Sequence, residues 1–517
     1  MSRYDNLYSS IALLEANHKT PELIDAPYEF PFPQMYPGQA EILGKVQGNE
    51  SFCLTSHTGF GKSPVFLSLT RNAPSIIIEP RKFLQAQIAK YYSDFILYGR
   101  SGYACQHAHS AVSAPCLLKE DCEGTQFHET CEKATQTCLN ESCTVFPVNR
   151  TFKTYPCENC DYIDAQKEAQ RTLKEAGTVV CNFGNFWNLV RSAKTVVVDE
   201  ADLFFRSINA PMKLKYSLPK AYPNDTIKEL LRREVSGLQK VAKDKDAGMR
   251  YKASNLLFSA QFLLKHNDLC FKYQRKDSFY IEIDPRNTNI LSQKLFKDKR
   301  IIIVSATPGA FELPSHSAEI HQRCGLYFAP VGNLTSFALK QNPYIMNTAA
   351  KAITEISDHF DMVYDNEHVI IHAANISTHA QAIYKILGED QCVLHSAGKL
   401  QETISDYLLS GKRYLIVASA EYGLDASWSK LQFVLKFPFP TLDERMRTLQ
   451  RLMGPDFNAY YTGEARTRST QTYGRNVRGF DDFGITICLD SKSYEDYMKN
   501  KTSYPGWLRS RVDERTY

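Results

Sequence analysis

The feature that most constrains what this chain can fold into is a glycine-containing stretch between two apolar runs, residues 52–54 and 65–67. The stretch consists of Ser56, His57, Thr58, Gly59, Phe60, Gly61, Lys62 and Ser63. Backbone N–H groups at a helix start can surround an anion, and glycine permits the close approach and unusual dihedral angles that this requires. In such a loop Lys62 would contact the β- and γ-phosphates of a nucleotide, and the Ser63 hydroxyl would bind Mg²⁺. The order strand, loop, helix therefore predicts a phosphate-binding loop, although Ser56 replaces the usual first glycine.

A second pattern typical of nucleotide binding is the β-branched run 196–198, which is followed directly by Asp199 and Glu200. Asp199 could hold Mg²⁺, and Glu200 could orient the attacking water. Gln39 precedes the loop, and its amide could read the adenine edge because it both donates and accepts hydrogen bonds. A proline-rich turn accounts for the Gln39 segment equally well. Together the loop and the acidic run predict a site for ATP and Mg²⁺.

Length and composition narrow the class of protein. The 517 residues suffice for two to four domains, and the net charge of +4 requires any nucleic-acid contact to come from local basic surface. The sequence has no apolar run long enough for a membrane span and no signal-peptide pattern, so we expect an intracellular protein of the cytoplasm or nucleus. Fourteen cysteines are then unsuited to a disulfide framework. Their crowding between Cys105 and Cys160 predicts a metal site.

The pattern of strands and helices predicts an α/β protein with two mostly parallel sheets. Apolar, β-branched runs at 75–78, 178–181 and 300–304 belong to the first half, and those at 368–373, 391–395 and 414–419 belong to the second. Within the first half, 226–243 and 252–265 have helical patterns with many Lys and Arg, and 280–283 is a short strand. We therefore predict a helical subdomain inserted at 206–298.

Polar residues that follow a buried strand face the ligand crevice in such sheets. Arg81, Lys82 and Gln85 follow the strand at 75–78 and could contact a phosphate backbone. Alternatively, these residues form a basic surface that is exposed to solvent and contacts no nucleic acid.

These residues resemble the helicases of superfamily 2, and specifically the XPD/DinG-like iron–sulfur group. Ser305-Ala306-Thr307 is a general helicase feature, Glu421 to Asp425 resembles the fifth helicase motif, and Gln471 to Gly479 resembles the sixth. The sequence 99–105 resembles the context of the first cluster ligand in that group, and Cys160-Asp161-Tyr162 resembles that of the last. The acidic box departs from the group's pattern because it ends in Asp202 where histidine is more common.

The resemblance implies two RecA-like domains with ATP between them. It places the first domain at 1–205, with a cysteine-rich insertion at about 100–165, an arch-like insertion at 206–298, a return to the first domain at 299–340 and the second domain at 341–517. Asp425 would join the nucleotide site, Gln471 would sense the nucleotide, and Arg475 and Arg478 would approach the γ-phosphate. Arg100, Tyr103 and Trp428 join Lys82 as candidates for contact with nucleic acid.

The resemblance also implies a [4Fe–4S] cluster, with Cys105, Cys116, Cys122 and Cys160 as ligands. Cys143 and Cys157 could replace members of this ligand set, because the segment contains eight cysteines and one cluster needs only four. Spacing alone does not separate iron–sulfur from zinc.

The leading function is an ATP-dependent DNA helicase that moves 5′ to 3′ on single-stranded and forked DNA, as a monomer. One alternative is an ATP-driven translocase that remodels protein–DNA or RNA–DNA complexes without separating duplex DNA. The other is a non-enzymatic, redox-sensing scaffold that binds nucleic acid, which the pairing of Lys62 with Asp199 and Glu200 disfavours.

Overall fold

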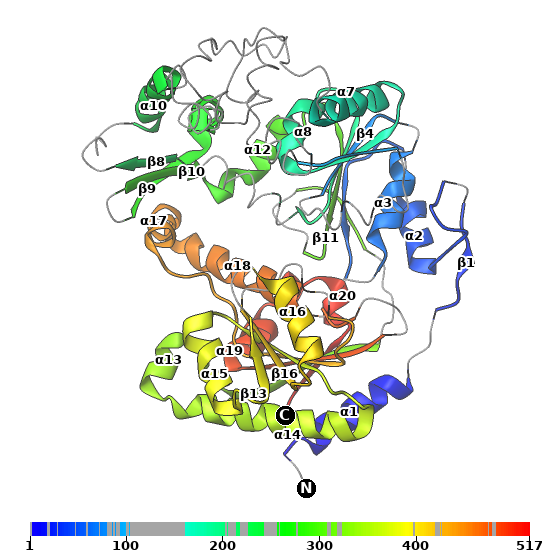
Figure 1. Ribbon diagram of the computed structural model, residues 1–517, viewed down its shortest axis with the longest axis vertical. Helices are drawn as coiled ribbons and strands as arrows, with labels where there is room; N and C mark the ends of the chain where they lie inside the picture. Colours follow the sequence, from blue (N-terminus) through cyan, green and yellow to red (C-terminus); the bar gives the residue numbers. More distant parts are fainter. Residues whose placement is uncertain are drawn as a thin grey trace, which may run out of the picture.

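The computed structural model contains two large parallel sheets, one above the other in Figure 1. The structure describes residues 3–17, 21–27, 29–46, 48–57, 60–71, 73–79, 85, 88, 94–99, 103, 161–201, 204, 214–217, 226–241, 256–257, 259–275, 278–307, 312–317, 323–395, 399–418, 424, 426–473, 475–477 and 482–517.

The first sheet has seven parallel strands in the order β12-β3-β11-β7-β4-β6-β5. Most of its strands are short runs of Ile, Val and Leu that are buried along their length, as expected of a parallel sheet covered on both faces. The strands are β3 (Phe52–Thr55), β4 (Ser75–Ile78), β5 (Phe95–Leu97), β6 (Thr178–Cys181), β7 (Thr195–Val198), β11 (Arg300–Ser305) and β12 (Ser315–His316). Its helices are α2 (Pro37–Lys45), α3 (Lys62–Thr70), α7 (Asp161–Lys174), α8 (Phe183–Leu189) and α12 (Thr288–Leu295).

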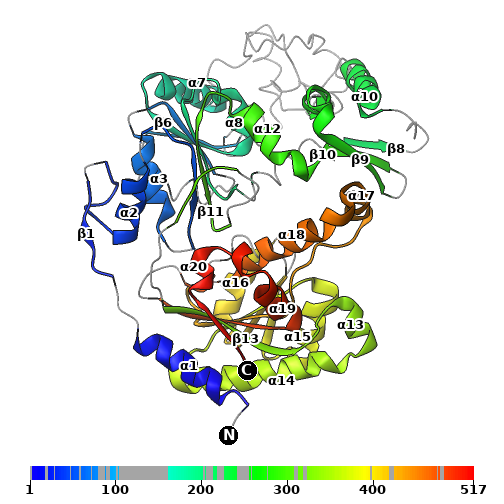
Figure 2. The same cartoon turned by 180° about the vertical axis from the view of Figure 1, so that it is seen from behind.

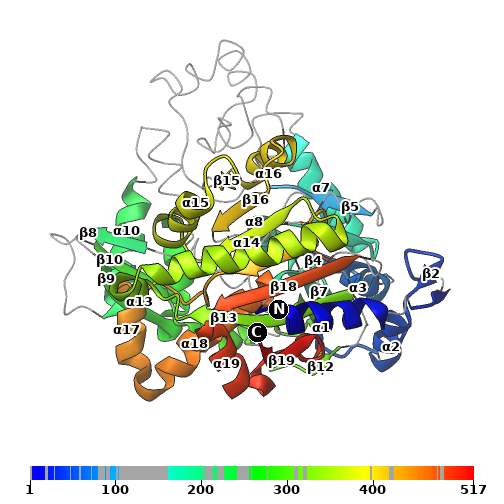
Figure 3. The same ribbon diagram turned by 90° about the horizontal axis from the view of Figure 1, so that it is seen from below.

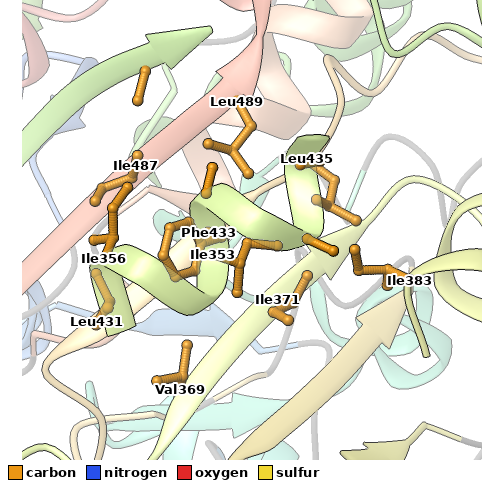
Figure 4. Close-up of a cluster of buried hydrophobic side chains, with 14 of the residues drawn as sticks. Ile353, Ile356, Val369, Ile371, Ile383, Leu431, Phe433, Leu435, Ile487 and Leu489 are labelled. Atoms are coloured by element: carbon orange, nitrogen blue, oxygen red, sulfur yellow. The ribbon is translucent and has the colours of Figure 1, made fainter. Parts of the chain in front are cut away.

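The second sheet also has seven parallel strands, in the order β15-β16-β14-β17-β18-β13-β19. Figure 4 shows its core, where Ile353 and Ile356 of α14 pack on Val369, Ile371 and Phe433. The strands are β13 (Arg323–Gly332), β14 (Val369–Ala373), β15 (Cys392–Leu394), β16 (Tyr414–Ala418), β17 (Leu431–Val434), β18 (Phe483–Asp490) and β19 (Val512–Thr516). The helices are α13 (Ser336–Gln341), α14 (Tyr344–Tyr364), α15 (Gln381–Leu387), α16 (Leu400–Leu409), α17 (Glu444–Met453), α18 (Phe457–Thr472), α19 (Ser491–Lys499) and α20 (Gly506–Arg509). The prediction of an α/β protein with two parallel sheets is confirmed.

The inserted segment is only partly helical. It contains α10 (Ile227–Val241), close to the expected helix, but also a three-stranded antiparallel sheet of β8 (Leu214–Ser217), β9 (Cys270–Arg275) and β10 (Ser278–Ile283). Figures 1 and 2 show β9 and β10 directly above α17 of the second domain. The sequence prediction missed β9 because Cys270–Arg275 mixes polar and apolar residues next to a helical pattern.

The start of the chain packs on the second domain. In α1 (Asp5–Ala16), Tyr4 at the N-cap, Leu7 and Ile11 are buried against the second sheet's core, and the Tyr8 ring stacks on His359 at 3.6 Å between centroids. Figure 3 shows α1 beside α14, with both chain ends nearby. A small hairpin of β1 (Ile24–Asp25) and β2 (Gln34–Met35) then leads to the first domain.

The domain limits at 205, 298 and 340 stay a prediction, but two elements bear on them. Strand β13 belongs to the second sheet although it precedes residue 341, and α1 packs on that domain from the other end of the sequence. The sequence of β13 contains Gly325 and Pro330, which hid the strand from a search for β-branched runs. Among the described residues, no helix combines the length and the apolar character that crossing a membrane would need.

Candidate nucleotide site and domain interface

The predicted phosphate loop joins β3 to α3, and Gly61 is the N-cap of that helix. Gly61 has φ 72° and ψ 48°, in the left-handed region that glycine adopts without a steric penalty. A Cβ at this position would lie 2.5 Å from Gln39 Nε2. The glycine is therefore required both by the backbone conformation and by the close approach of Gln39.

Gln39 holds the end of the loop. The Gln39 amide nitrogen donates to the carbonyls of Phe60 at 3.2 Å and Gly61 at 3.0 Å, and its oxygen accepts from the Tyr36 N–H at 2.9 Å. The side chain is 3% exposed. In this arrangement the amide positions the loop, and the contact with adenine stays a prediction.

Lys62 begins α3 and points back over the loop. Its Nζ donates to the carbonyls of Ser56 at 3.2 Å and His57 at 2.9 Å, while Ser63 follows it in the first helical turn. The charge of Lys62 also acts on Asp199, so the loop and the acidic run lie close together. Thr58 and Gly59 lie outside the described residues.

The two carboxylates lie where β7 ends. The Asp199 N–H donates to the Ile78 carbonyl at 3.1 Å, and Asp199 Oδ1 accepts from the Glu200 N–H at 2.9 Å. Glu200 has φ 47°, an uncommon conformation for a residue other than glycine. Burial, followed by the charge of Glu200, raises the pKa of Asp199 to about 6, against the lowering effect of Lys62. Asp199 and the Ser63 hydroxyl are oxygen donors of the kind Mg²⁺ prefers, so these residues fit the predicted metal.

Sequence reasoning missed a third carboxylate at this site. Glu79 follows β4, is fully buried, and its side chain hydrogen-bonds with Asp199. The register of β4 with β7 places Ile78 opposite Val198, so the two residues that follow are neighbours. The available signal was a glutamate directly after a buried apolar strand.

The second domain contacts the first next to this site. Gln471, near the end of α18, donates from Nε2 to Thr307 Oγ1 at 3.1 Å, and Thr307 lies 3.3 Å from Ser305 through their hydroxyls. Trp507 Nε1 donates to the Ala306 carbonyl at 3.1 Å. The segment Ser305–Thr307 at the end of β11 is therefore held by two side chains of the second domain.

Arg475 is 3% exposed, and its Nε donates to the Gln471 carbonyl at 2.6 Å. This bond connects the arginine to the residue that contacts Thr307, and the role of Arg475 at the γ-phosphate stays a prediction. Asp425 and Arg478 lie outside the described residues.

Of the residues expected to contact nucleic acid, Gln85 and Tyr103 have partners inside the first domain. Gln85 is fully buried, and its Nε2 donates to the Glu79 carbonyl at 2.8 Å. The Tyr103 hydroxyl accepts from the Tyr98 N–H at 3.1 Å. Trp428 packs on Tyr407, with ring centroids 5.5 Å apart. Arg81, Lys82 and Arg100 lie outside the described residues.

The cysteines assigned to a metal cluster also lie outside the described residues: Cys105, Cys116, Cys122, Cys143, Cys157 and Cys160. Within the described part of the chain, no group of three or more His, Cys, Asp or Glu side chains could hold a metal ion. The two ends of the cysteine-rich segment meet, because the rings of Tyr103 and Tyr162 are 5.5 Å apart.

Comparison with known proteins agrees with this architecture. Residues 365–511 match a family model described as the helicase C-terminal domain. A solved XPD helicase aligns with a TM-score of 0.55 and 13% identity, over 93% of this chain and 98% of that one. Xpd4 of S. tokodaii aligns with a TM-score of 0.52 and 12% identity, over 93% and 99%. An apo XPD structure aligns with a TM-score of 0.52 and 13% identity, over 93% of this chain and 99% of that one.

No match was found among curated proteins. At this identity the solved structures establish the fold, and the family model shows what the second domain is similar to. The resemblance found in the sequence is thus confirmed: residues 365–511 match the helicase C-terminal domain model, and the chain as a whole has the fold of XPD helicases.

Proposed function

We propose that this protein is an ATP-dependent helicase that moves 5′ to 3′ on single-stranded DNA and separates duplex DNA at forks. The observation that carries the proposal is the hydrogen bond from Gln471 to Thr307. It joins the second domain to the strand next to the phosphate loop, so hydrolysis at the loop has a direct connection to movement of the second domain.

The chemistry assigned to each group follows from its position. Lys62 would exchange its loop carbonyls for phosphate oxygens, and Asp199 and Ser63 would hold Mg²⁺, which would neutralise charge at the phosphates. Glu200 orients the attacking water. Arg475 acts from the second domain, because its guanidinium is always charged and forks onto phosphate oxygens.

A strand-displacement assay tests the proposal. Wild-type protein, ATP and a duplex with a 5′ single-stranded tail are expected to yield displaced strand, whereas a 3′-tailed duplex is not. Lys62→Ala should abolish displacement and strand-stimulated ATP hydrolysis, because the phosphates lose their cation. The exposed Lys385→Gln variant is the control for loss of one positive charge.

The outcomes separate the alternatives. Strand-stimulated hydrolysis without displacement on either tail would favour a translocase that remodels protein–DNA or RNA–DNA complexes. DNA binding without hydrolysis would favour a non-enzymatic scaffold. Retention by Lys62→Ala of more than about a tenth of wild-type turnover would reject the assigned loop.

We also propose that the cysteine-rich segment holds a [4Fe–4S] cluster through Cys105, Cys116, Cys122 and Cys160. Thiolates suit such a cluster, and the contact between Tyr103 and Tyr162 brings the two ends of the segment together. Anaerobic purification with visible absorbance and iron and zinc analysis tests this. Colourless protein with stoichiometric zinc and no iron would overturn the cluster.

A further inference from the structure

Trp507 of the second domain contacts the phosphate loop as well as the segment at the end of β11. Its indole Nε1 donates to the Ala306 carbonyl at 3.1 Å, and its ring centroid lies 6.1 Å from that of His57. Aromatic rings attract each other at centroid distances of about 4.5–7 Å. His57 belongs to the phosphate loop and is fully buried, and Trp507 is 3% exposed. The second domain therefore contacts the loop itself.

Within the second domain, the Trp507 ring has a fixed place. It lies in α20, which Figure 2 shows on the side of that domain that faces the first. The Arg511 guanidinium lies over the indole ring, 5.4 Å from its centroid, and such a cation is attracted to the ring face. Arg511 is in turn joined to β13, because its carbonyl accepts from the Leu326 N–H at 2.9 Å. Movement of the second domain must therefore carry the indole ring with it.

His57 is also a loop residue to which Lys62 is hydrogen-bonded. The His57 carbonyl accepts from Lys62 Nζ at 2.9 Å and from the Phe60 N–H at 3.4 Å. The His57 ring meets the Phe60 ring edge to face, with centroids 5.8 Å apart. The backbone and the side chain of His57 thus belong to one arrangement of the loop, in which Lys62 points back at the loop carbonyls.

A bound nucleotide requires a different arrangement of this loop. In the proposed function Lys62 leaves the carbonyls of Ser56 and His57 for phosphate oxygens. His57 then loses one of the bonds that hold its backbone, next to the ring that contacts Trp507. An interaction that stabilises one state of a two-state element lowers the apparent affinity of a ligand that binds the other state. The contact between His57 and Trp507 should therefore oppose nucleotide binding.

We propose that Trp507 is a positioning residue for the phosphate loop. Through His57 it stabilises the arrangement in which Lys62 is turned back onto the loop, and nucleotide binding weakens this contact. The inference rests on the proposed function, because it requires that the loop bind ATP. It adds a second path from the nucleotide site to the second domain, since neither His57 nor Trp507 takes part in the hydrogen bond from Gln471 to Thr307.

Isothermal titration calorimetry with Mg·ADP, in the absence of DNA, tests the inference. His57→Ala and Trp507→Leu each remove one ring of the pair and should bind Mg·ADP about twofold to tenfold more tightly than the wild-type protein. Trp507→Phe keeps a ring beside His57 and should stay closer to the wild-type affinity. The double variant H57A/W507L should bind no more tightly than the tighter single variant, because both substitutions remove the same contact.

Intrinsic fluorescence gives a second readout that does not depend on activity. The chain has three tryptophans, Trp187, Trp428 and Trp507. Because Trp507 is buried beside His57, saturating Mg·ADP should change its emission. The change should be lost in Trp507→Phe. It should persist in Trp428→Phe, the matched control, because Trp428 packs on Tyr407 within the second domain.

Weaker Mg·ADP binding by His57→Ala would overturn the inference, because a merely structural brace of the loop predicts that result. Wild-type affinity in His57→Ala, or a Trp507 emission that Mg·ADP leaves unchanged, would also overturn it. Either result leaves the helicase proposal intact, since Lys62→Ala tests that proposal separately. If Trp507→Leu does not fold, His57→Ala and the fluorescence measurement decide the question. Failure of the wild-type protein to bind Mg·ADP would reject the proposed function and this inference with it.

Discussion

The ion pair between the inserted sheet and the second domain offers the sharpest test of how this molecule is held together. Arg445 of α17 donates from Nε to Glu282 Oε2 of β10 at 2.7 Å, and the Tyr273 hydroxyl donates to Glu282 Oε1 at 2.6 Å. Apolar side chains surround the pair: Phe271, Tyr273, Met446, Leu449, Met453 and Phe457. We predict that Arg445→Met loosens the inserted sheet from the second domain.

The size of the effect follows from burial. The Glu282 side chain is 5% exposed and that of Arg445 is 24% exposed, so methionine would leave a carboxylate with little access to water. Glu282 also raises the pKa of Arg445, although burial alone would lower it. Removing one partner of a buried pair typically costs about 3–5 kcal/mol. The double variant E282Q/R445M should lose less than R445M, because no buried charge remains.

Hydrogen exchange of backbone amides provides the assay. Opening of this interface exposes the amides of β9, β10 and α17, so their exchange should accelerate about a hundredfold or more in Arg445→Met. Amides in the core of the second sheet should keep the wild-type rate.

A matched control lies on the same inserted sheet. Arg275 is 55% exposed and lies 4.0 Å from Asp443, so Arg275→Met should cost less than about 1 kcal/mol. Exchange in Arg445→Met that stays within about twofold of wild type would refute the claim that the buried pair holds the interface.

Three further predictions concern the nucleotide site. Gly61→Ala should cost roughly 1–2 kcal/mol from the left-handed conformation alone, and more because the new Cβ meets Gln39. Thermal unfolding and ATP affinity measure this effect. The control is Gly44→Ala in α2, which has open space and a helical backbone and should therefore not destabilise the protein. Arg475→Ala should lower ATP turnover by about 10³-fold or more with a smaller change in ATP affinity; poor binding with normal turnover at saturation would contradict it. Since the pKa of Asp199 is raised to about 6, Mg·ATP affinity should fall as the pH drops below that value, and Asp199→Asn should lack this component. The same shift makes the folded state hold more protons than the unfolded state between pH ~4 and ~6, so this group's contribution to stability decreases as the pH rises through that window.

Local chemistry explains what could be predicted without a structure. The phosphate loop needs glycine at a left-handed position, and β7 ends in carboxylates directly after a buried run. Both signals lie within a few neighbouring residues. The β-branched strands could be assigned for the same reason.

Glu79 and Gln85 show where local patterns were insufficient. The position of Glu79 beside Asp199 depends on the pairing of β4 with β7, which are more than a hundred residues apart in sequence. The burial of Gln85 depends on packing around the turn after β4. Polar residues near a phosphate loop can face the ligand or brace the loop, and only their neighbours in space distinguish these roles.

The sequence by itself determined the two parallel sheets, the glycine-containing loop between β3 and α3 and the resemblance to XPD helicases, because each depends on residue type and short-range spacing. Only the tertiary structure decided that α1 packs on the second domain, that the inserted sheet docks on α17 through Glu282 and Arg445, and that Trp507 lies beside His57 of the phosphate loop. Each of these joins segments that are distant in sequence or carry no distinctive pattern. Their contacts arise from the burial of apolar surface, which depends on area and shape and leaves no fixed spacing in the chain.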